Sequence, residues 1–255
     1  MFASEQMDQE AVARLFTESR LLAGPVLDDD RRMRGIVAAD DIVDVVEQEA
    51  SEDIQKFGGV EALDGPYLRI RFWQMVQKRA GWLTVLFVGE MLTANAMGYF
   101  EEEIARAVVL ALFIPLIISS GGKSGSQATT LVIRAIALGE IRLRDWWRVN
   151  YREFSTGLAL GGVLAIIGMA RILLWQVIWR PYGPHFMVIT FTVACSLVGF
   201  MLFGTLAGSM LPFVLSRVGL DPASASAPFV ATLVDVTGLL VYFTIARTIL
   251  KGTLL

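Results

Sequence analysis

The chain has 255 residues, of which 55% are hydrophobic and 18% charged, and its mean hydropathy is +0.56. This composition excludes an ordinary soluble domain of the same length, which would carry more charge. Residues 1–64 hold 16 acidic and 6 basic side chains, a net charge of −10, whereas residues 65–255 hold 9 and 16, a net charge of +7. The pattern predicts an acidic segment followed by a membrane domain with basic flanks.

Cysteine and histidine each occur once, as Cys195 and His185. One cysteine cannot form an internal disulfide or a thiolate metal site. His185 lies in a turn rich in proline and glycine, and no nucleophile is arranged around it, so we expect a protein that is not an enzyme. The polar first ten residues do not resemble a signal peptide, and we expect the N-terminus to stay in the cytoplasm.

Residues 1–64 predict a small acidic α/β segment. Helix, strand, strand and helix are expected in that order over Gln9–Leu22, Gly24–Leu27, Met33–Ala38 and Ala39–Gln55. A unit of this size buries little core alone, so we expect it to pack against a second copy or against the membrane domain. Residues 65–80 predict a connecting segment, with a helix over Tyr67–Arg79.

Residues 81–255 predict five membrane-spanning helices, because a bilayer takes about 20 helical residues. The apolar runs cover Gly81–Phe100, Ile104–Ser120 continued by Ala128–Leu138, Phe154–Trp179, Phe186–Val214 and Pro228–Leu250. Basic residues cluster before the first run and between the second and third. The positive-inside rule then places the N-terminus inside and the C-terminus outside the plasma membrane.

The second run is interrupted by GGKSGSQ at 121–127, where we expect irregular backbone that protein or water must cover. The letters GKS suggest a nucleotide-binding loop, but that motif needs a glycine at position 117, which is isoleucine. Two interpretations stay open and can hold together. One is close helix packing through Gly121 and Gly125; the other is a polar path lined by Gly121, Gly122, Ser124, Ser126 and Gln127.

Two acidic residues lie in the middle of predicted spans. Asp235 is the stronger candidate, since a charge at the bilayer centre normally faces a cavity or a partner and a carboxylate suits Mg²⁺ or Ca²⁺. The alternatives are an ion pair with a buried arginine and a role in capping a broken helix. For Glu90, a role in the path and an ion pair with Arg171 or Arg134 both stay open. The acidic residues of the first segment predict either weak cation sites or a solvated face.

Three stretches resemble the MgtE family of magnesium channels. FIPLIISSGGKSGSQATTLVIRAIALGEI (113–141) is similar to the family's second membrane helix, and DPASASAPFVATLVDVTGLLVYF (221–243) to its fifth. GPVLDDDRRMRGIVAADDIVDVVEQEASEDI (24–54) is similar to the end of the family's regulatory CBS module. The resemblance covers nearly the whole chain.

The resemblance implies a homodimer in the lipid bilayer, with Mg²⁺ as the transported ion and a path along the dimer axis built from the second and fifth helices. The family's pore aspartate falls on Asp235, and its backbone position one turn earlier on Ala231. Residues Tyr67–Arg79 match the connecting plug helix. Cytoplasmic Mg²⁺ that gates the channel would bind near Glu49, Glu52 and Asp53.

The chain also departs from the family pattern. It begins within the second CBS motif, so we expect either a truncated sensor or a fragment of a longer protein, and in both cases ATP binding is doubtful. Lys123 stands where the family often has asparagine. No nucleic-acid partner is expected. Two alternatives remain: transport of another divalent ion such as Mn²⁺, Co²⁺ or Zn²⁺, with Zn²⁺ disfavoured by the absence of clustered His and Cys, and a membrane-anchored nucleotide or ion sensor without transport.

Overall fold

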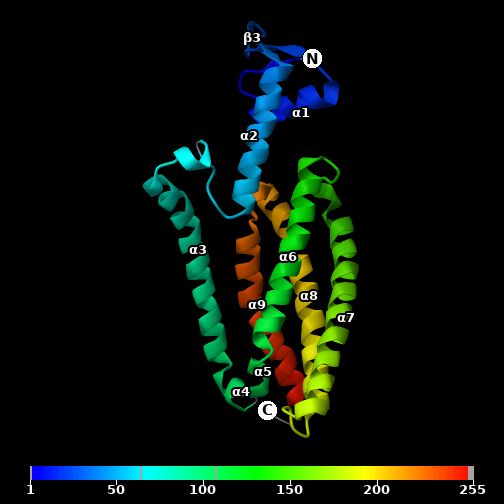
Figure 1. Ribbon diagram of the computed structural model, residues 1–255. Helices are drawn as coiled ribbons and strands as arrows, with labels where there is room; N and C mark the ends of the chain where they lie inside the picture. Colours follow the sequence, from blue (N-terminus) through cyan, green and yellow to red (C-terminus); the bar gives the residue numbers. More distant parts are fainter. Residues whose placement is uncertain (1, 64, 107, 252–255) are drawn as a thin grey trace. The chain divides into compact units, whose positions relative to one another are not determined.

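The computed structural model describes residues 2–63, 65–106 and 108–251 (Figure 1). The chain divides into two compact units, each described by itself. The smaller comprises Met1–Lys56 and Glu61–Ile70, and the larger comprises Phe57–Val60 and Arg71–Leu255. The expected fold class is confirmed: a helical membrane domain with five spans follows a small α/β segment.

The smaller unit is a three-stranded sheet with two helices. Its elements are β1 (Ala3–Ser4), α1 (Gln9–Ser19), β2 (Ala23–Leu27), β3 (Met33–Ala38), α2 (Ala39–Phe57) and a 3₁₀ turn, η1 (Tyr67–Arg69). The sheet order is β1-β2-β3, with β2 parallel to β1 and antiparallel to β3. A small core of Ala13, Phe16 and Ile42 joins the two helices. The sequence reading missed β1, which is only two residues long.

The larger unit contains the five spans. Its elements are α3 (Phe72–Tyr99), α4 (Glu101–Arg106), α5 (Val108–Ala111), α6 (Ile114–Ala137), η2 (Leu143–Asp145), α7 (Trp146–Trp179), α8 (Phe186–Arg217), η3 (Pro222–Ser224) and α9 (Ala227–Leu250). Among the residues that the structure describes, five helical segments are long and apolar enough to cross a membrane. The chain is therefore a multi-pass membrane protein.

The expected break in the second span is misplaced. Residues 121–127 are helical throughout, and the helix is instead interrupted at Leu112 and Phe113, between α5 and α6. Pro115 explains the position, because a proline lacks an N–H and its ring clashes with the carbonyl four residues earlier, here that of Ala111. The hydroxyl of Tyr242 donates to the Leu110 carbonyl at 2.8 Å, so this buried carbonyl at the interruption of the helix has a side-chain partner.

The helix expected over residues 67–79 is also divided. Tyr67–Arg69 forms a 3₁₀ turn, Ile70 is extended, and α3 begins at Phe72. The remainder of the expected connecting helix is therefore the first turns of α3 and continues without interruption into the first span. No proline or glycine between Phe72 and Arg79 separates the two.

Helix α8 is the centre of the larger unit and packs against α6, α7 and α9 (Figure 1). Glycines allow this close approach. A Cβ on Gly204 would lie 2.5 Å from the Gly121 carbonyl oxygen, and one on Gly208 would overlap the Gly125 carbonyl. Thr129 Oγ1 then donates to the carbonyl of Gly208 at 2.7 Å. The GGKSGSQ run therefore stays helical because its glycines pack against a second helix, as small-residue membrane interfaces do.

Candidate cation site at the α6–α9 interface

Asp235 lies two turns into α9, on the part of the helix that faces α6. The start of α9 is fixed by Ser226, whose Oγ accepts from the Phe229 N–H at 3.3 Å and from Trp82 Nε1 at 3.0 Å. Asp235 is half-buried, and its Oδ1 atom is buried without a hydrogen-bond partner among the described residues. A buried carboxylate oxygen without a donor is costly and marks a place that a cation or water would fill.

Gly122 of α6 faces this carboxylate directly. A Cβ built on Gly122 would lie 3.1 Å from Asp235 Oδ1 and 3.6 Å from the Cα atom of Ala231. The structure therefore brings three residues together. Ala231 and Asp235 lie one turn apart on α9, and Gly122 faces them from α6. The absence of a side chain on Gly122 leaves open the space beside the carboxylate oxygen.

The other polar residues of the run take different positions. Ser126 Oγ lies 3.0 Å from the Gly122 carbonyl and 3.2 Å from that of Ala227, so its hydroxyl links α6 to α9. Gly121 packs against the Phe200 ring of α8. Ser124 is buried, and its Oγ has no partner among the described residues. Gln127 is exposed.

Glu90 is exposed on α3, which packs along α9. The neighbouring Gly89 faces the Thr232 methyl group, which a Cβ on that glycine would approach to 3.1 Å.

The alternative ion pairs are not formed. Within residues 2–63, 65–106 and 108–251, no ion pair joins Glu90 or Asp235 to an arginine. Arg171 instead donates to the Tyr182 hydroxyl at 3.4 Å and lies over the Trp175 ring, 5.1 Å from its centroid. Neither Glu90 nor Asp235 is therefore neutralised by an arginine among the described residues.

Lys123 belongs to an exposed polar stripe on α6. Residues at three- and four-residue spacing share one helix face, and the exposed polar residues of α6 follow this spacing: Ser119, Lys123, Gln127, Thr130 and Arg134. Lys123 forms no ion pair with any acidic residue that the structure describes. Lys123 follows Gly122 in sequence, but it lies on the exposed side of α6, whereas Gly122 is buried.

The three carboxylates expected to bind regulatory Mg²⁺ lie on α2. Glu49 accepts from Gln9 Nε2 at 2.6 Å, and Glu52 pairs with Lys56 at 2.7 Å. Asp53 also has an interaction partner. No group of three or more His, Cys, Asp or Glu side chains suited to a metal ion occurs among the described residues. A site on these residues would need ligands beyond those of the single smaller unit.

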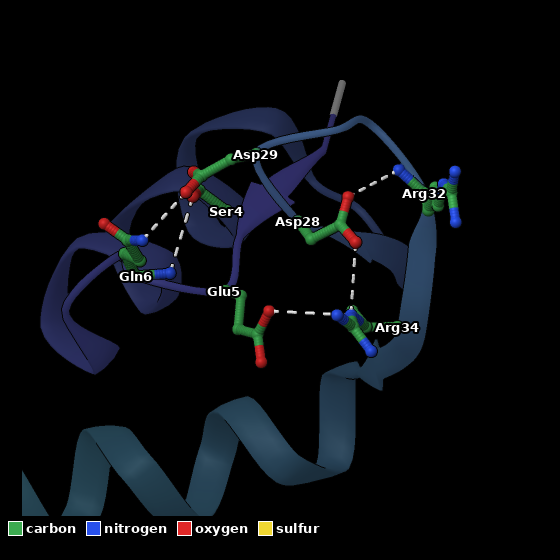
Figure 2. A network of polar contacts seen from close by, with 7 residues as sticks. All are labelled: Ser4, Glu5, Gln6, Asp28, Asp29, Arg32 and Arg34. Carbon is green, nitrogen blue, oxygen red and sulfur yellow. Dashed lines mark hydrogen bonds and ion pairs between the residues drawn. The ribbon is translucent and has the colours of Figure 1, made fainter.

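A second polar network, which the sequence reading did not anticipate, lies at the β1–β2–β3 edge of the smaller unit (Figure 2). Arg34 Nε lies 3.2 Å from Asp28 and 3.7 Å from Glu5, and the Asp28 carboxylate also accepts from the Arg32 N–H at 2.7 Å. Gln6 Nε2 donates to Asp29 at 3.1 Å. These contacts close the turn between β2 and β3 and tie it to β1.

Comparison with known proteins bears on both units. The family model MgtE, described as a divalent cation transporter, matches residues 114–245, from the first residue of α6 into α9. The Magnesium transporter MgtE of Thermus thermophilus is 39% identical over 252 residues, which cover 99% of this chain and 54% of that protein. Proteins of the same name from Bacillus subtilis and Enterococcus faecalis are each 34% identical, over 96% of this chain and 52% and 51% of theirs. The chain thus spans about half the length of these relatives.

Proposed function

This chain belongs to the MgtE family of divalent cation transporters, and we propose that it conducts Mg²⁺ across the membrane as a homodimer. The observation that carries the proposal is the Asp235 carboxylate, with a buried Oδ1 that has no donor among the described residues of a membrane-spanning helix. A charged group at membrane depth requires compensation. A cation bound at Asp235 would supply that compensation, and in a cation transporter such a site would form part of the path of the ion.

Oxygen ligands and space favour a hydrated ion. Mg²⁺ prefers oxygen ligands and gives up its waters reluctantly. A Cβ on Gly122 would lie 3.1 Å from Asp235 Oδ1 and 3.6 Å from the Ala231 Cα atom, so the glycine keeps the α6 side of the carboxylate free of side-chain atoms. We therefore infer that Asp235 holds a largely hydrated ion through its charge and through bridging waters, together with the backbone near Ala231.

The polar stripe on α6 supports the homodimer. Lipid cannot satisfy the side chains at positions 119, 123, 127, 130 and 134 at membrane depth. Two-fold dimers are the commonest closed oligomers. With a two-fold axis next to α6 and α9, the stripe of one subunit would pack against the same stripe of the second subunit. The two Asp235 carboxylates would then both face one aqueous path. Gln127 would then line that path, and Lys123 would have to turn from it or pair with an acidic residue of the second copy.

We also propose that cytoplasmic Mg²⁺ gates the path through the acidic segment. The positive-inside rule places residues 1–64 in the cytoplasm, and their net charge of −10 repels a second copy. Mg²⁺ shared between Glu49, Glu52 or Asp53 and a neighbouring surface would favour a compact state. An ion shifts this balance only by its difference in affinity between the two states.

The test is ion flux into liposomes that contain the purified chain. Uptake of Mg²⁺ that Mn²⁺, Co²⁺ or Zn²⁺ does not suppress at equal concentration supports the proposal, whereas preferential uptake of one of those ions would establish a different substrate. Absence of any flux from folded protein would favour a sensor without transport. Single cysteines at the exposed Leu233 or Leu240 of α9, in a Cys195→Ser background, should cross-link two copies; a conducting monomer would refute the dimer.

A further inference from the structure

A cavity of about 590 Å³ lies between the start of α7 and the end of α8, away from the α6–α9 interface. Its walls come from η2 and the first turns of α7 on one side and from the last turns of α8 on the other. The cavity therefore lies within the larger unit, at the end of two membrane-spanning helices. It contains none of the residues assigned above to cation transport.

The outer end of this cavity is basic. Arg144 and Arg217 both line it, and both are exposed. Neither guanidinium forms an ion pair with an acidic side chain in the described part of the chain, and the acidic residue nearest in sequence, Asp145, instead faces Arg148 at 3.9 Å. Asn150 adds an amide to the lining. Two guanidinium groups without an acidic partner that line the same cavity suit a phosphate group, because the arginine fork matches its oxygens.

The rest of the lining is largely apolar and includes Leu143, Met210, Phe213 and Val214. From position 217 back to position 210, α8 extends about 10 Å at 1.5 Å per residue. The lining therefore combines two basic side chains with an apolar stretch that is longer than a free phosphate ion and suits the first part of a lipid tail.

Aromatic residues place this cavity at the membrane surface. Trp146 lines it, and Trp146 and Trp147 at the start of α7 are 47% and 66% exposed. Tryptophan concentrates at the boundary between hydrocarbon and headgroups. Arginine side chains at the same level reach the headgroups while the apolar wall below them meets the acyl chains.

We propose that this cavity binds an anionic phospholipid, with the phosphate between Arg144 and Arg217 and one acyl chain against Met210 and Phe213. Each half of the cavity excludes a simpler ligand. A zwitterionic lipid would bring a cationic group next to its phosphate, which two guanidinium groups repel, and a free phosphate would leave the apolar lining uncovered. Basic pockets between membrane helices recognise anionic headgroups in this way. The proposal does not depend on which ion the chain transports.

Native mass spectrometry of the full chain in a neutral detergent tests the proposal. Phosphatidylglycerol, phosphatidylcholine and inorganic phosphate are added separately at equal concentrations. We expect phosphatidylglycerol to bind in one retained copy per chain and at least about 10-fold more tightly than the other two. Arg144→Gln with Arg217→Gln should weaken its binding by roughly 30-fold, since each basic residue near a membrane surface contributes about one fivefold step.

Arg148→Gln with Arg152→Gln, both on α7, is the matched control, because it removes two positive charges near the cavity from residues that do not line it. The control should change the affinity by less than about 3-fold, since these two charges act on the bound headgroup only across screening solvent. Val214→Trp, which fills the cavity without changing any charge, should also abolish binding. Equal losses in the control and the cavity variant, tight binding of phosphate alone, or unchanged binding in Val214→Trp would each overturn the proposal.

Discussion

Gly122→Ala is the most specific perturbation of the proposed cation site, because it adds one methyl group beside Asp235 and changes no charge. The added Cβ would lie 3.1 Å from Asp235 Oδ1 and 3.6 Å from the nearest atoms of Ala231. These distances are tight but leave the helices able to adjust by a few tenths of an ångström. We therefore expect the variant to insert and fold.

The magnitude follows from what the methyl group displaces. A methyl group 3.1 Å from Asp235 Oδ1 would crowd the carboxylate oxygen from the α6 side and keep a water of the hydrated ion from donating to it there. The hydrated ion would lose one charge-assisted hydrogen bond, worth about 1.5–3 kcal/mol. Such a loss corresponds to a fall in Mg²⁺ flux of about 10-fold to 150-fold.

The assay is Mg²⁺ uptake into liposomes at several external concentrations, with Gly162→Ala as control. Gly162 is also a glycine within a membrane helix, but a Cβ there would meet no atom within 4 Å. The control should conduct as the parent does, and both variants should elute and melt as the parent does. Parent-like uptake by a folded Gly122→Ala protein would refute the role of the open space beside Asp235.

Three further predictions address the helix packing, the polar stripe and the acidic segment. Gly208→Ala should lower the thermal midpoint of the purified protein by several degrees or prevent assembly, because its Cβ would overlap the α6 backbone, which cannot rotate away. Lys123→Asn should leave single-channel conductance for Mg²⁺ equal or up to about 3-fold higher, since it removes a positive charge near the path. Millimolar Mg²⁺ should slow proteolysis of residues 47–79 by about 10-fold, and Glu49→Ala with Asp53→Ala should remove that protection and raise open probability at high Mg²⁺.

Each of these has a result that would count against it. A Gly208→Ala protein as stable as the parent would show that α6 and α8 can separate without cost. A fall in conductance in Lys123→Asn would show that the lysine pairs with an acidic residue and holds the helix in place. Identical cleavage of the parent with Mg²⁺ and with chelator would identify the acidic residues as a solvated surface.

Much of the fold could be predicted because the membrane imposes length and hydropathy on each span. The start of β3, the end of α7 and the end of α9 lie where the sequence indicated them. The break predicted in the second span was wrong for a physical reason: the glycines at 121 and 125 have no side chain that would stabilise an isolated helix. Their helical state depends on Gly204 and Gly208 of α8, which contact them across 79 residues or more of chain. Pro115 was the available signal for the true break.

The candidate site was predictable in part. Asp235 could be selected from sequence because an acidic residue within an apolar run is rarely incidental. Periodicity could not predict that Gly122 faces Asp235, because the pairing of α6 with α9 depends on tertiary packing. Only the family resemblance indicated that these two helices lie together. The cavity between α7 and α8 could not be predicted from the sequence, because Arg144 of η2 and Arg217 of α8 are far apart along the chain and line one cavity only in the folded bundle.

Mg²⁺ flux through Asp235→Asn protein in liposomes tests the central claim most directly. The change keeps the size of the side chain and removes the charge that compensates ion desolvation. With Glu140→Gln, an exposed acidic residue in the loop after α6, as control, the account predicts at least a 100-fold loss of flux in Asp235→Asn and parent-like flux in the control. Parent-like Mg²⁺ flux through folded Asp235→Asn protein would contradict the account.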